Sequence, residues 1–315
     1  MRKASICGLL LAVAALLLPA IGQAAQPLRI GTNVWPGYEP LYLAAERENW
    51  KSKLDIRMVE YPSATEVIRA FRNRALEGAA LTLDEVLTLR EANIPLKVIA
   101  VLDISSGGDV ILAKAGIAHF SDLAGRRIGV ESNALGAYIL TRALELHDMT
   151  LDELEVVPLA VNAHEGAFRD EKVDAVVTFE PVRSRLLHAG AHEIFSSREI
   201  PGEVVDVLVV HAETLRAEGP RLRELLAGWF RALDYLHDDP LGAARFTARR
   251  LKITPEQVVA SYAGLELPDP AQNLALLNGP LQETLWRLQQ TLVSKRLLTS
   301  ATATDGLLYG GLIPR

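Results

Sequence analysis

Apolar residues along the chain fall into short runs with the spacing of a strand and longer runs with the spacing of a helix. The short runs alternate with polar residues or are rich in Val, Ile and Leu, which predicts β-strands. In the first part of the chain they cover residues 27–32, 56–61, 79–81, 96–102 and 110–113. Between them, apolar residues three and four positions apart predict helices. This order is typical of a mostly parallel, doubly wound sheet.

Two of these helices begin at a capping box, in which Ser or Thr is followed three residues later by Glu. The first box joins Ser63 and Glu66, and the second joins Thr82 and Glu85. Each box comes directly after a predicted strand. The boxes therefore predict where two strands end and the next helices begin.

The alternation continues to about residue 211 and then changes. Further strands are predicted over 127–130, 155–161, 173–178 and 204–211, with helices over 133–147 and 165–170. From there on the pattern is purely helical, over 220–237, 254–263 and 282–293. The predicted fold class is therefore α/β, with two doubly wound lobes followed by a helical C-terminal tail.

No linker rich in Pro, Gly or Ser separates the two α/β blocks. We therefore expect strands to pass directly between lobes, at 109–114 and 206–211, with the tail packed on the first lobe. Lobe one is then 27–112 together with 207–315, and lobe two is 113–206. Such a hinge would create a cleft that can close on a ligand.

The first residues have the order of a secretory signal peptide. Arg2 and Lys3 precede an apolar run over 6–21, and small residues follow it. The run is shorter than the ~20 residues that a membrane-spanning helix needs. We expect residues 1–24 to be cleaved and the remaining chain to be periplasmic.

Composition and charge exclude several classes of function. The chain has 315 residues and a net charge of −6, which becomes −8 without the two basic residues of the signal peptide. A mildly acidic chain with no basic block is not expected to bind nucleic acid. The single cysteine, Cys7, lies in the signal peptide, so the mature chain has neither disulfides nor thiolate metal sites. Serine-hydrolase, phosphate-loop and zinc-protease motifs are absent, so we expect no enzyme activity, metal or cofactor.

Three segments carry a family resemblance: Gly-Thr-Asn-Val-Trp-Pro-Gly-Tyr at 31–38, Asp-Leu-Ala-Gly-Arg-Arg-Ile-Gly-Val at 122–130, and Val-Asp-Ala-Val-Val-Thr-Phe-Glu-Pro at 173–181. Together they resemble periplasmic substrate-binding proteins of ABC importers, in the nitrate, sulfonate and taurine branch, which is related to thiamin-pyrimidine-precursor binding proteins. The resemblance implies a type II periplasmic-binding fold that closes on a small molecule and delivers it to a membrane permease. We expect a monomer. Two alternatives are a receptor that presents its ligand to a membrane sensor and a secreted enzyme.

Ligands of open α/β sheets bind outside the carboxyl ends of the strands. The loops expected there are 33–40, 82–85, 103–109, 131–136, 179–182 and 203–206, and they contain nine acidic residues and no Lys or Arg. Carboxylates accept strong hydrogen bonds from N–H donors, and aromatic side chains can cover a cationic ligand. This charge pattern favours an amine, guanidinium or aminopyrimidine ligand.

Two other interpretations stay open. Backbone N–H groups near Ser132 and in the turn 105–108 could bind an oxyanion without any basic side chain, and a neutral ligand is also compatible. Several acids, Asp84 among them, also suit the first turn of a helix. The candidate ligand-binding residues are Trp35, Tyr38, Thr82, Asp84, Ser106, Gly108, Asp109, Glu131, Ser132, Phe179, Glu180 and Asp206.

Overall fold

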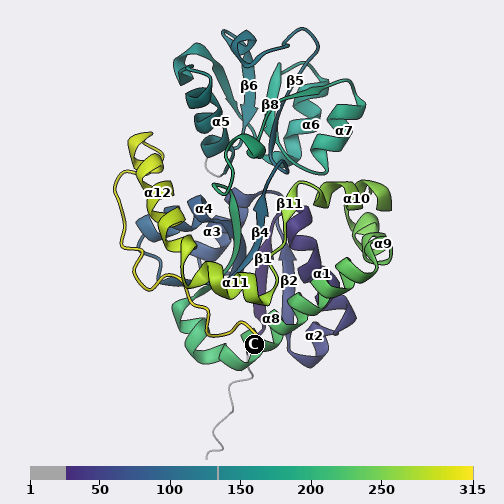
Figure 1. Cartoon of the computed structure of the whole chain (residues 1–315), viewed down its shortest axis with the longest axis vertical. Coiled ribbons are helices and arrows are strands. Elements are labelled where there is room, and N and C mark those ends of the chain that lie inside the picture. The colour runs from purple at the N-terminus through teal and green to yellow at the C-terminus, as the bar shows by residue number, and fades with distance from the viewer. Residues whose placement is uncertain (1–25, 133–134, 315) are drawn as a thin grey trace, which may run out of the picture.

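The computed structural model describes residues 26–132 and 135–314, which form two α/β lobes, one above the other in Figure 1. The predicted signal peptide, residues 1–24, lies outside the described residues. None of the described helices is long and apolar enough to cross a membrane. The α/β class and the helical C-terminal region predicted from the sequence are confirmed.

The first lobe is built on a six-stranded sheet in the order β11-β4-β10-β3-β1-β2. Its strands are β1 Leu28–Thr32, β2 Ile56–Glu60, β3 Gly78–Thr82, β4 Leu96–Ser105, β10 Val205–His211 and β11 Leu265–Glu266. β1 runs parallel to β2 and β3, whereas β10 runs antiparallel to β3 and β4. The connecting helices are α1 Glu39–Arg47, α2 Trp50–Lys53, α3 Ala64–Arg72 and α4 Leu83–Glu91. Both capping boxes lie at helix starts, because Ser63 precedes α3 and Thr82 precedes α4.

The second lobe is built on a five-stranded sheet in the order β7-β6-β8-β5-β9. Its strands are β5 Val110–Ala113, β6 Arg127–Val130, β7 Glu155–Pro158, β8 Ala175–Thr178 and β9 His192–Ser196. Its helices are α5 Leu135–Leu146, α6 Val161–Arg169 and α7 Val182–His188, with short 3-10 turns η3 Phe120–Leu123, η4 Leu151–Glu153 and η5 Ser197–Glu199. β9 and α7 are absent from the sequence prediction.

The two passages between the sheets differ from the predicted ones. The expected crossings, 109–114 and 206–211, contain β5 and β10, and each of these strands pairs along its length within one sheet. The chain instead passes between the sheets over 106–109 and over 197–204, just before each strand. At the first passage Gly107 has a φ of 108°, a left-handed conformation that favours glycine. The boundaries between the two lobes, placed between residues 112 and 113 and between residues 206 and 207, stay a prediction.

A buried serine pair joins the two passages. The Ser105 and Ser197 hydroxyls are 2.8 Å apart, and the Gly107 N–H donates to the Ser197 hydroxyl at 2.7 Å. The Ser197 N–H donates in turn to the Asp109 carbonyl at 2.9 Å. These bonds satisfy polar groups that would otherwise be buried without partners. They hold the two connecting segments together beneath the cleft.

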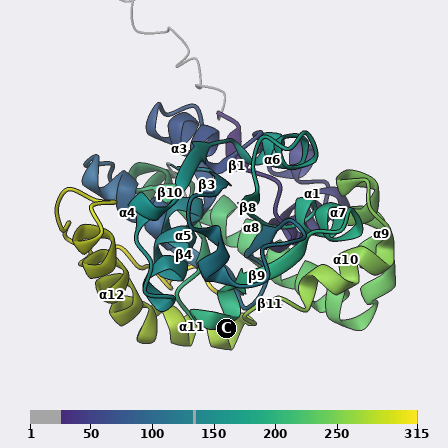
Figure 2. The same cartoon turned by 90° about the horizontal axis from the view of Figure 1, so that it is seen from above.

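The C-terminal region wraps around the first lobe. It contains α8 Ala212–Asp238, α9 Pro240–Leu251, α10 Pro255–Tyr262, α11 Pro270–Leu277 and α12 Pro280–Ser294. The last four helices begin with proline, which lacks the N–H that a first helical residue leaves unbonded. Figures 1 and 2 show α12 along one side of this lobe and α9 with α10 along the other. The expectation of a purely helical tail is wrong at one point, because Leu265–Glu266 adds the edge strand β11 beside β4.

Candidate ligand-binding site

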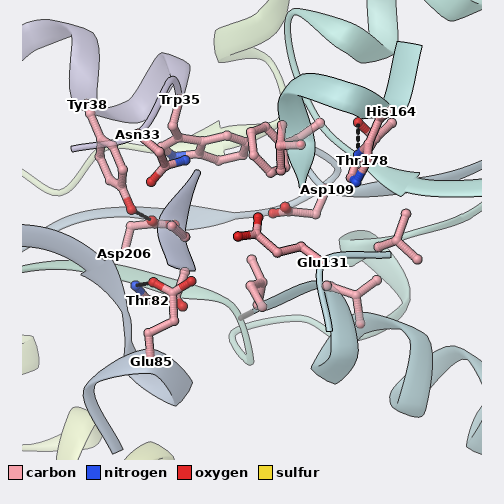
Figure 3. A pocket seen from close by; sticks show the side chains of 17 residues that line it. Asn33, Trp35, Tyr38, Thr82, Glu85, Asp109, Glu131, His164, Thr178 and Asp206 are labelled. Atoms are coloured by element: carbon pink, nitrogen blue, oxygen red, sulfur yellow. Dashed lines mark hydrogen bonds between the residues drawn. The ribbon is translucent and has the colours of Figure 1, made fainter. Parts of the chain in front are cut away.

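A small cavity lies between the two lobes. Its walls come from the ends of strands in both sheets, where ligands of α/β proteins bind. Figure 3 shows the lining side chains pointing into it from both sides. Seven predicted residues line the cavity: Trp35, Tyr38, Thr82, Asp109, Glu131, Phe179 and Asp206.

The wall from the first lobe begins with the turn after β1. Trp35 precedes a 3-10 turn, η2 Pro36–Tyr38, and its indole N–H donates to Asp103 Oδ2 at 3.1 Å. The turn needs glycine at position 37, because a Cβ there would overlap the Asp103 carboxylate. The Tyr38 hydroxyl donates to Asp206 Oδ1 on β10. Both aromatic rings are thereby fixed against the strand ends.

Carboxyl groups gather on neighbouring strands of this wall. Asp206 on β10 stands opposite Asp103 on β4 and Thr82 on β3. Glu85, in the first turn of α4, accepts a hydrogen bond from the Thr82 N–H at 3.0 Å and also lines the cavity. Asp109 is 3% exposed, and its Oδ2 has no hydrogen-bond partner among the described residues.

Burial dominates the electrostatics of these acids. It raises the pKa of Asp109 to about 7 and the pKa of Glu85 and of Asp103 to about 8. Burial, together with the neighbouring Asp103 carboxylate, raises the pKa of Asp206 well above its usual range. No Lys or Arg is among the lining residues of the described chain. Without a cation, the cavity therefore favours protonated carboxyl groups near neutral pH.

The second lobe contributes an aromatic ring and a neutral histidine. Phe179 follows β8 and meets Trp35 edge to face, with ring centroids 5.3 Å apart. His164 on α6 lies 3.3 Å from the Thr178 hydroxyl and 3.2 Å from the Leu159 carbonyl. Burial lowers the pKa of His164 to about 4, so the ring is uncharged at neutral pH. The histidine adds no positive charge to the cavity.

Glu131 connects the two lobes at the cavity. It follows β6, and its Oε1 accepts hydrogen bonds from the N–H of Thr65, at 3.0 Å, and from the Thr65 hydroxyl. Thr65 lies in the first turn of α3 in the other lobe. Both bonds go to Oε1, and among the described residues no hydrogen bond to Oε2 is found.

Five predicted residues do not line this cavity: Asp84, Ser106, Gly108, Ser132 and Glu180. Glu180 accepts bonds from the Ser184 N–H at 3.1 Å and the Ser184 hydroxyl at 2.9 Å, and it pairs with Arg183 at 3.2 Å. It therefore caps α7 instead of facing the cavity. Asp84 and Ser132 border a separate depression near α12. The Ser106 N–H donates to the Gly264 carbonyl at 2.8 Å.

The sequence reasoning missed four polar lining residues, Asn33, Glu85, His164 and Thr178. Glu85 could have been found, because it lies within one of the candidate loops, but its capping-box role explained it fully. His164 has no signal in the sequence beyond being a histidine on a helix. The remaining lining residues are apolar or glycine: Ala64, Leu135, Gly136, Ile139, Val161 and Val177.

Comparison with known proteins identifies the family. The profile described as NMT1/THI5 like matches residues 35–243. The chain belongs to this family. The predicted resemblance is thereby confirmed at the level of the family.

Solved structures similar to this NMT1/THI5-like protein show the fold. The alkanesulfonate-binding protein SsuA from Xanthomonas axonopodis pv. citri, bound to MOPS, has a TM-score of 0.78 at 18% identity, with 91% of this chain and 100% of that chain covered. The periplasmic aliphatic sulphonate-binding protein SsuA from Escherichia coli has a TM-score of 0.72 at 17% identity, with 91% and 99% covered. The type II periplasmic-binding fold predicted from the sequence is confirmed.

Curated relatives match over a shorter stretch. A binding protein of Brucella abortus is 24% identical over 161 residues, which are 50% of this chain and 50% of the relative. The chain thus spans about half the length of the curated relatives it matches. Among the described residues, no group of three or more His, Cys, Asp or Glu is placed to hold a metal ion.

Proposed function

We propose that this NMT1/THI5-like protein is a non-catalytic, periplasmic solute-binding protein of an ABC importer. It closes its two lobes on a small cation that carries N–H donors, such as an amine, a guanidinium or an aminopyrimidine, and delivers it to a membrane permease. The family, the fold and the signal-peptide pattern of residues 1–24 support the first part of this proposal. The chemistry of the cavity supports the ligand class.

The observation that carries the ligand class is a set of buried acids without a counter-charge. Glu85, Asp109, Glu131 and Asp206 line the cavity, and no described Lys or Arg does. An ionised carboxylate in such a place is costly unless a cation or several donors accompany it. A ligand with positive charge and N–H groups supplies both, because carboxylates form strong charge-assisted bonds with such donors. Asp109 Oδ2, which has no hydrogen-bond partner in the described part of the chain, can accept such a bond.

The aromatic residues suit the same ligand. Trp35 and Phe179 come from opposite lobes and meet at the cavity. The faces of such rings attract cations and pack against planar groups. A ligand in the cavity would therefore contact a ring from each lobe.

The backbone groups considered for an oxyanion are largely occupied by the protein itself. In the turn 105–108 the N–H groups of Ser106 and Gly107 donate to the Gly264 carbonyl and the Ser197 hydroxyl. The N–H of Asp109, one residue beyond the turn, donates to the Ser105 hydroxyl at 3.2 Å. An anion at this turn would have to displace those acceptors. This occupancy supports a ligand other than the sulfonates of the structural neighbours.

A thermal-shift screen of the purified protein tests the proposal. The panel contains methylguanidine, methylamine and 4-aminopyrimidine on one side and methanesulfonate and nitrate on the other. A ligand that binds the folded chain raises its melting temperature by mass action. We expect shifts from the cationic or N–H-donor compounds. Shifts from the anions alone would refute the ligand class.

Two variants then test the site. Asp109→Asn together with Asp206→Asn should weaken binding of the best compound by about 30-fold or more, because a buried charge pair is lost. Glu180→Gln is the matched control, since Glu180 is an equally buried acid bonded within α7. Equal affinity in the double variant and the control would show that the cavity acids do not hold the ligand.

A further inference from the structure

At the start of α3 a carboxylate from the opposite lobe fills an anion-binding position beside the cavity. The first N–H groups of a helix have no partners within the helix, and the helix dipole favours negative charge there. The Ser63 hydroxyl accepts from the Glu66 N–H at 3.4 Å. The N–H of Thr65, the second residue of α3, donates a hydrogen bond to Glu131 of the opposite lobe.

Glu131 is well placed to keep this position closed to a ligand. It is 7% exposed, and its Oε1 also receives the Thr65 hydroxyl, so two donors hold one oxygen. Figure 3 shows its carboxylate directed into the cavity. A ligand oxyanion could take the Thr65 N–H only by displacing Glu131, and it would then lie against the displaced carboxylate.

We infer that Glu131 sets the charge specificity of the cavity, by occupying the N-terminus of α3 so that a sulfonate or related oxyanion cannot bind there. The charge of the natural ligand rests on the proposed function. The exclusion of anions by Glu131 rests on the contacts with Thr65 alone. A second consequence is that the same carboxylate fastens the lobes together at the cavity.

Removing the side chain should therefore expose an anion site. In Glu131→Ala the Thr65 N–H and hydroxyl lose their acceptor, and the N-terminus of α3 opens toward the cavity. In Glu131→Gln an amide oxygen can still accept from Thr65, so the position stays filled although its charge is gone. The two variants separate the occupancy of the helix end from the loss of a negative charge.

A third variant controls for charge elsewhere in the cavity. Asp109→Ala removes another lining carboxyl but leaves Glu131 on α3. Measurements are made at pH 6.0, which is below the pKa of about 8 for Glu85 and of about 7 for Asp109 that burial produces. His164 is neutral at that pH as well.

The experiment is calorimetric titration of methanesulfonate, and then sulfate, into the wild type and the three variants. We expect Glu131→Ala to bind methanesulfonate at least about tenfold more tightly than the wild type, and Glu131→Gln and Asp109→Ala to gain much less. No gain in Glu131→Ala, or an equal gain in Glu131→Gln, would overturn the inference. If Glu131→Ala shows no cooperative melting, Glu131→Ser replaces it, because its hydroxyl is two carbons too short to reach Thr65.

The result is independent of the ligand screen. A wild type that binds no cation would contradict the proposed function, yet the gain of anion binding in Glu131→Ala would still be measurable. Conversely, a cation-binding wild type whose Glu131→Ala variant ignores anions would leave the proposed function standing and refute the role of Glu131.

Discussion

Asp109→Asn should change how the stability of the ligand-free protein depends on pH. In the unfolded chain Asp109 has the ordinary pKa of an aspartate, near 3.9, and is ionised above about pH 5. In the folded chain burial raises its pKa to about 7, so it keeps its proton to that pH. Between these values the folded state binds one more proton than the unfolded state. The contribution of Asp109 to the free energy of unfolding is therefore complete below about pH 4 and is lost as the pH rises through 7.

One such group gives a slope of about −1.4 kcal/mol per pH unit in the free energy of unfolding. From pH 5.0 to 6.5 the wild type should therefore lose about 2 kcal/mol through Asp109 alone. Asparagine resembles the protonated acid and has no proton to lose. The free energy of unfolding of the variant should therefore fall less steeply with pH, by about 1.4 kcal/mol per pH unit. The other buried acids, Glu85 and Asp103 among them, keep contributing in both proteins.

Urea unfolding at pH 5.0, 5.75 and 6.5 measures these slopes. The wild type is compared with Asp109→Asn and with Glu180→Gln, whose side chain lies outside the cavity. We expect the free energy of unfolding of the wild type and of the control to fall more steeply with pH than that of Asp109→Asn. Parallel lines for the wild type and Asp109→Asn would refute the conclusion that burial raises the pKa of this carboxyl.

Three further variants test the packing around the cleft. Gly37→Ala should lower the free energy of unfolding by about 1–3 kcal/mol, because the added Cβ would overlap a buried carboxylate. Gly166→Ala is the control and should not lower it, because a Cβ there meets nothing within 4 Å. Equal melting temperatures of the two variants would contradict this prediction. Ser197→Ala should cost about 1–3 kcal/mol in urea unfolding, because a buried backbone N–H loses its acceptor, and an unchanged midpoint would contradict it. Arg185→Ala removes a 3.2 Å bond from α7 to the end of α9 across the lobes. It should increase the radius of gyration in X-ray scattering, and an unchanged radius would show that this bond does not hold the lobes together.

The sequence predicted those elements whose hydrophobic period is strong. β10 reads as Val-Asp-Val-Leu-Val-Val-His and is buried along its whole length, so its existence was clear. The sheet that it joins was not clear, because a strand buried along its whole length gives no sign of its neighbours. β9 and α9 were missed because His192–Ser196 has only two large apolar residues and Pro240–Leu251 is rich in Ala and Arg.

The site was predictable where it depends on strand ends. Trp35, Asp109 and Asp206 follow or begin strands, so their meeting at one edge follows from the topology. Glu180 also lies after a strand, but Arg183 and Ser184, within one turn, satisfy its carboxylate locally. A side chain with such local partners can turn toward them instead of toward the cavity. The spacing of residues in the sequence does not show which of the two orientations is adopted.

The structural neighbours and the cavity point to different ligand charges. Two SsuA proteins share the fold with this chain at 18% and 17% identity, and their names refer to sulfonates. At that identity the fold is shared, but the side chains of the site need not be. In this chain Glu131 accepts hydrogen bonds from Thr65 at the start of α3, and Asp109 and Asp206 line the same cavity. The ligand class therefore depends on this chain's own residues.

The affinity for methylguanidine as a function of pH tests the central claim most directly. A guanidinium keeps its charge throughout the range, so any change in affinity reports on the protein. If the cavity carboxylates hold the cation, binding must remove their protons, and the affinity should rise by about tenfold per pH unit for each proton released between pH 6 and 7. An affinity that does not change with pH, or a wild type that binds methanesulfonate and not methylguanidine, would contradict the account.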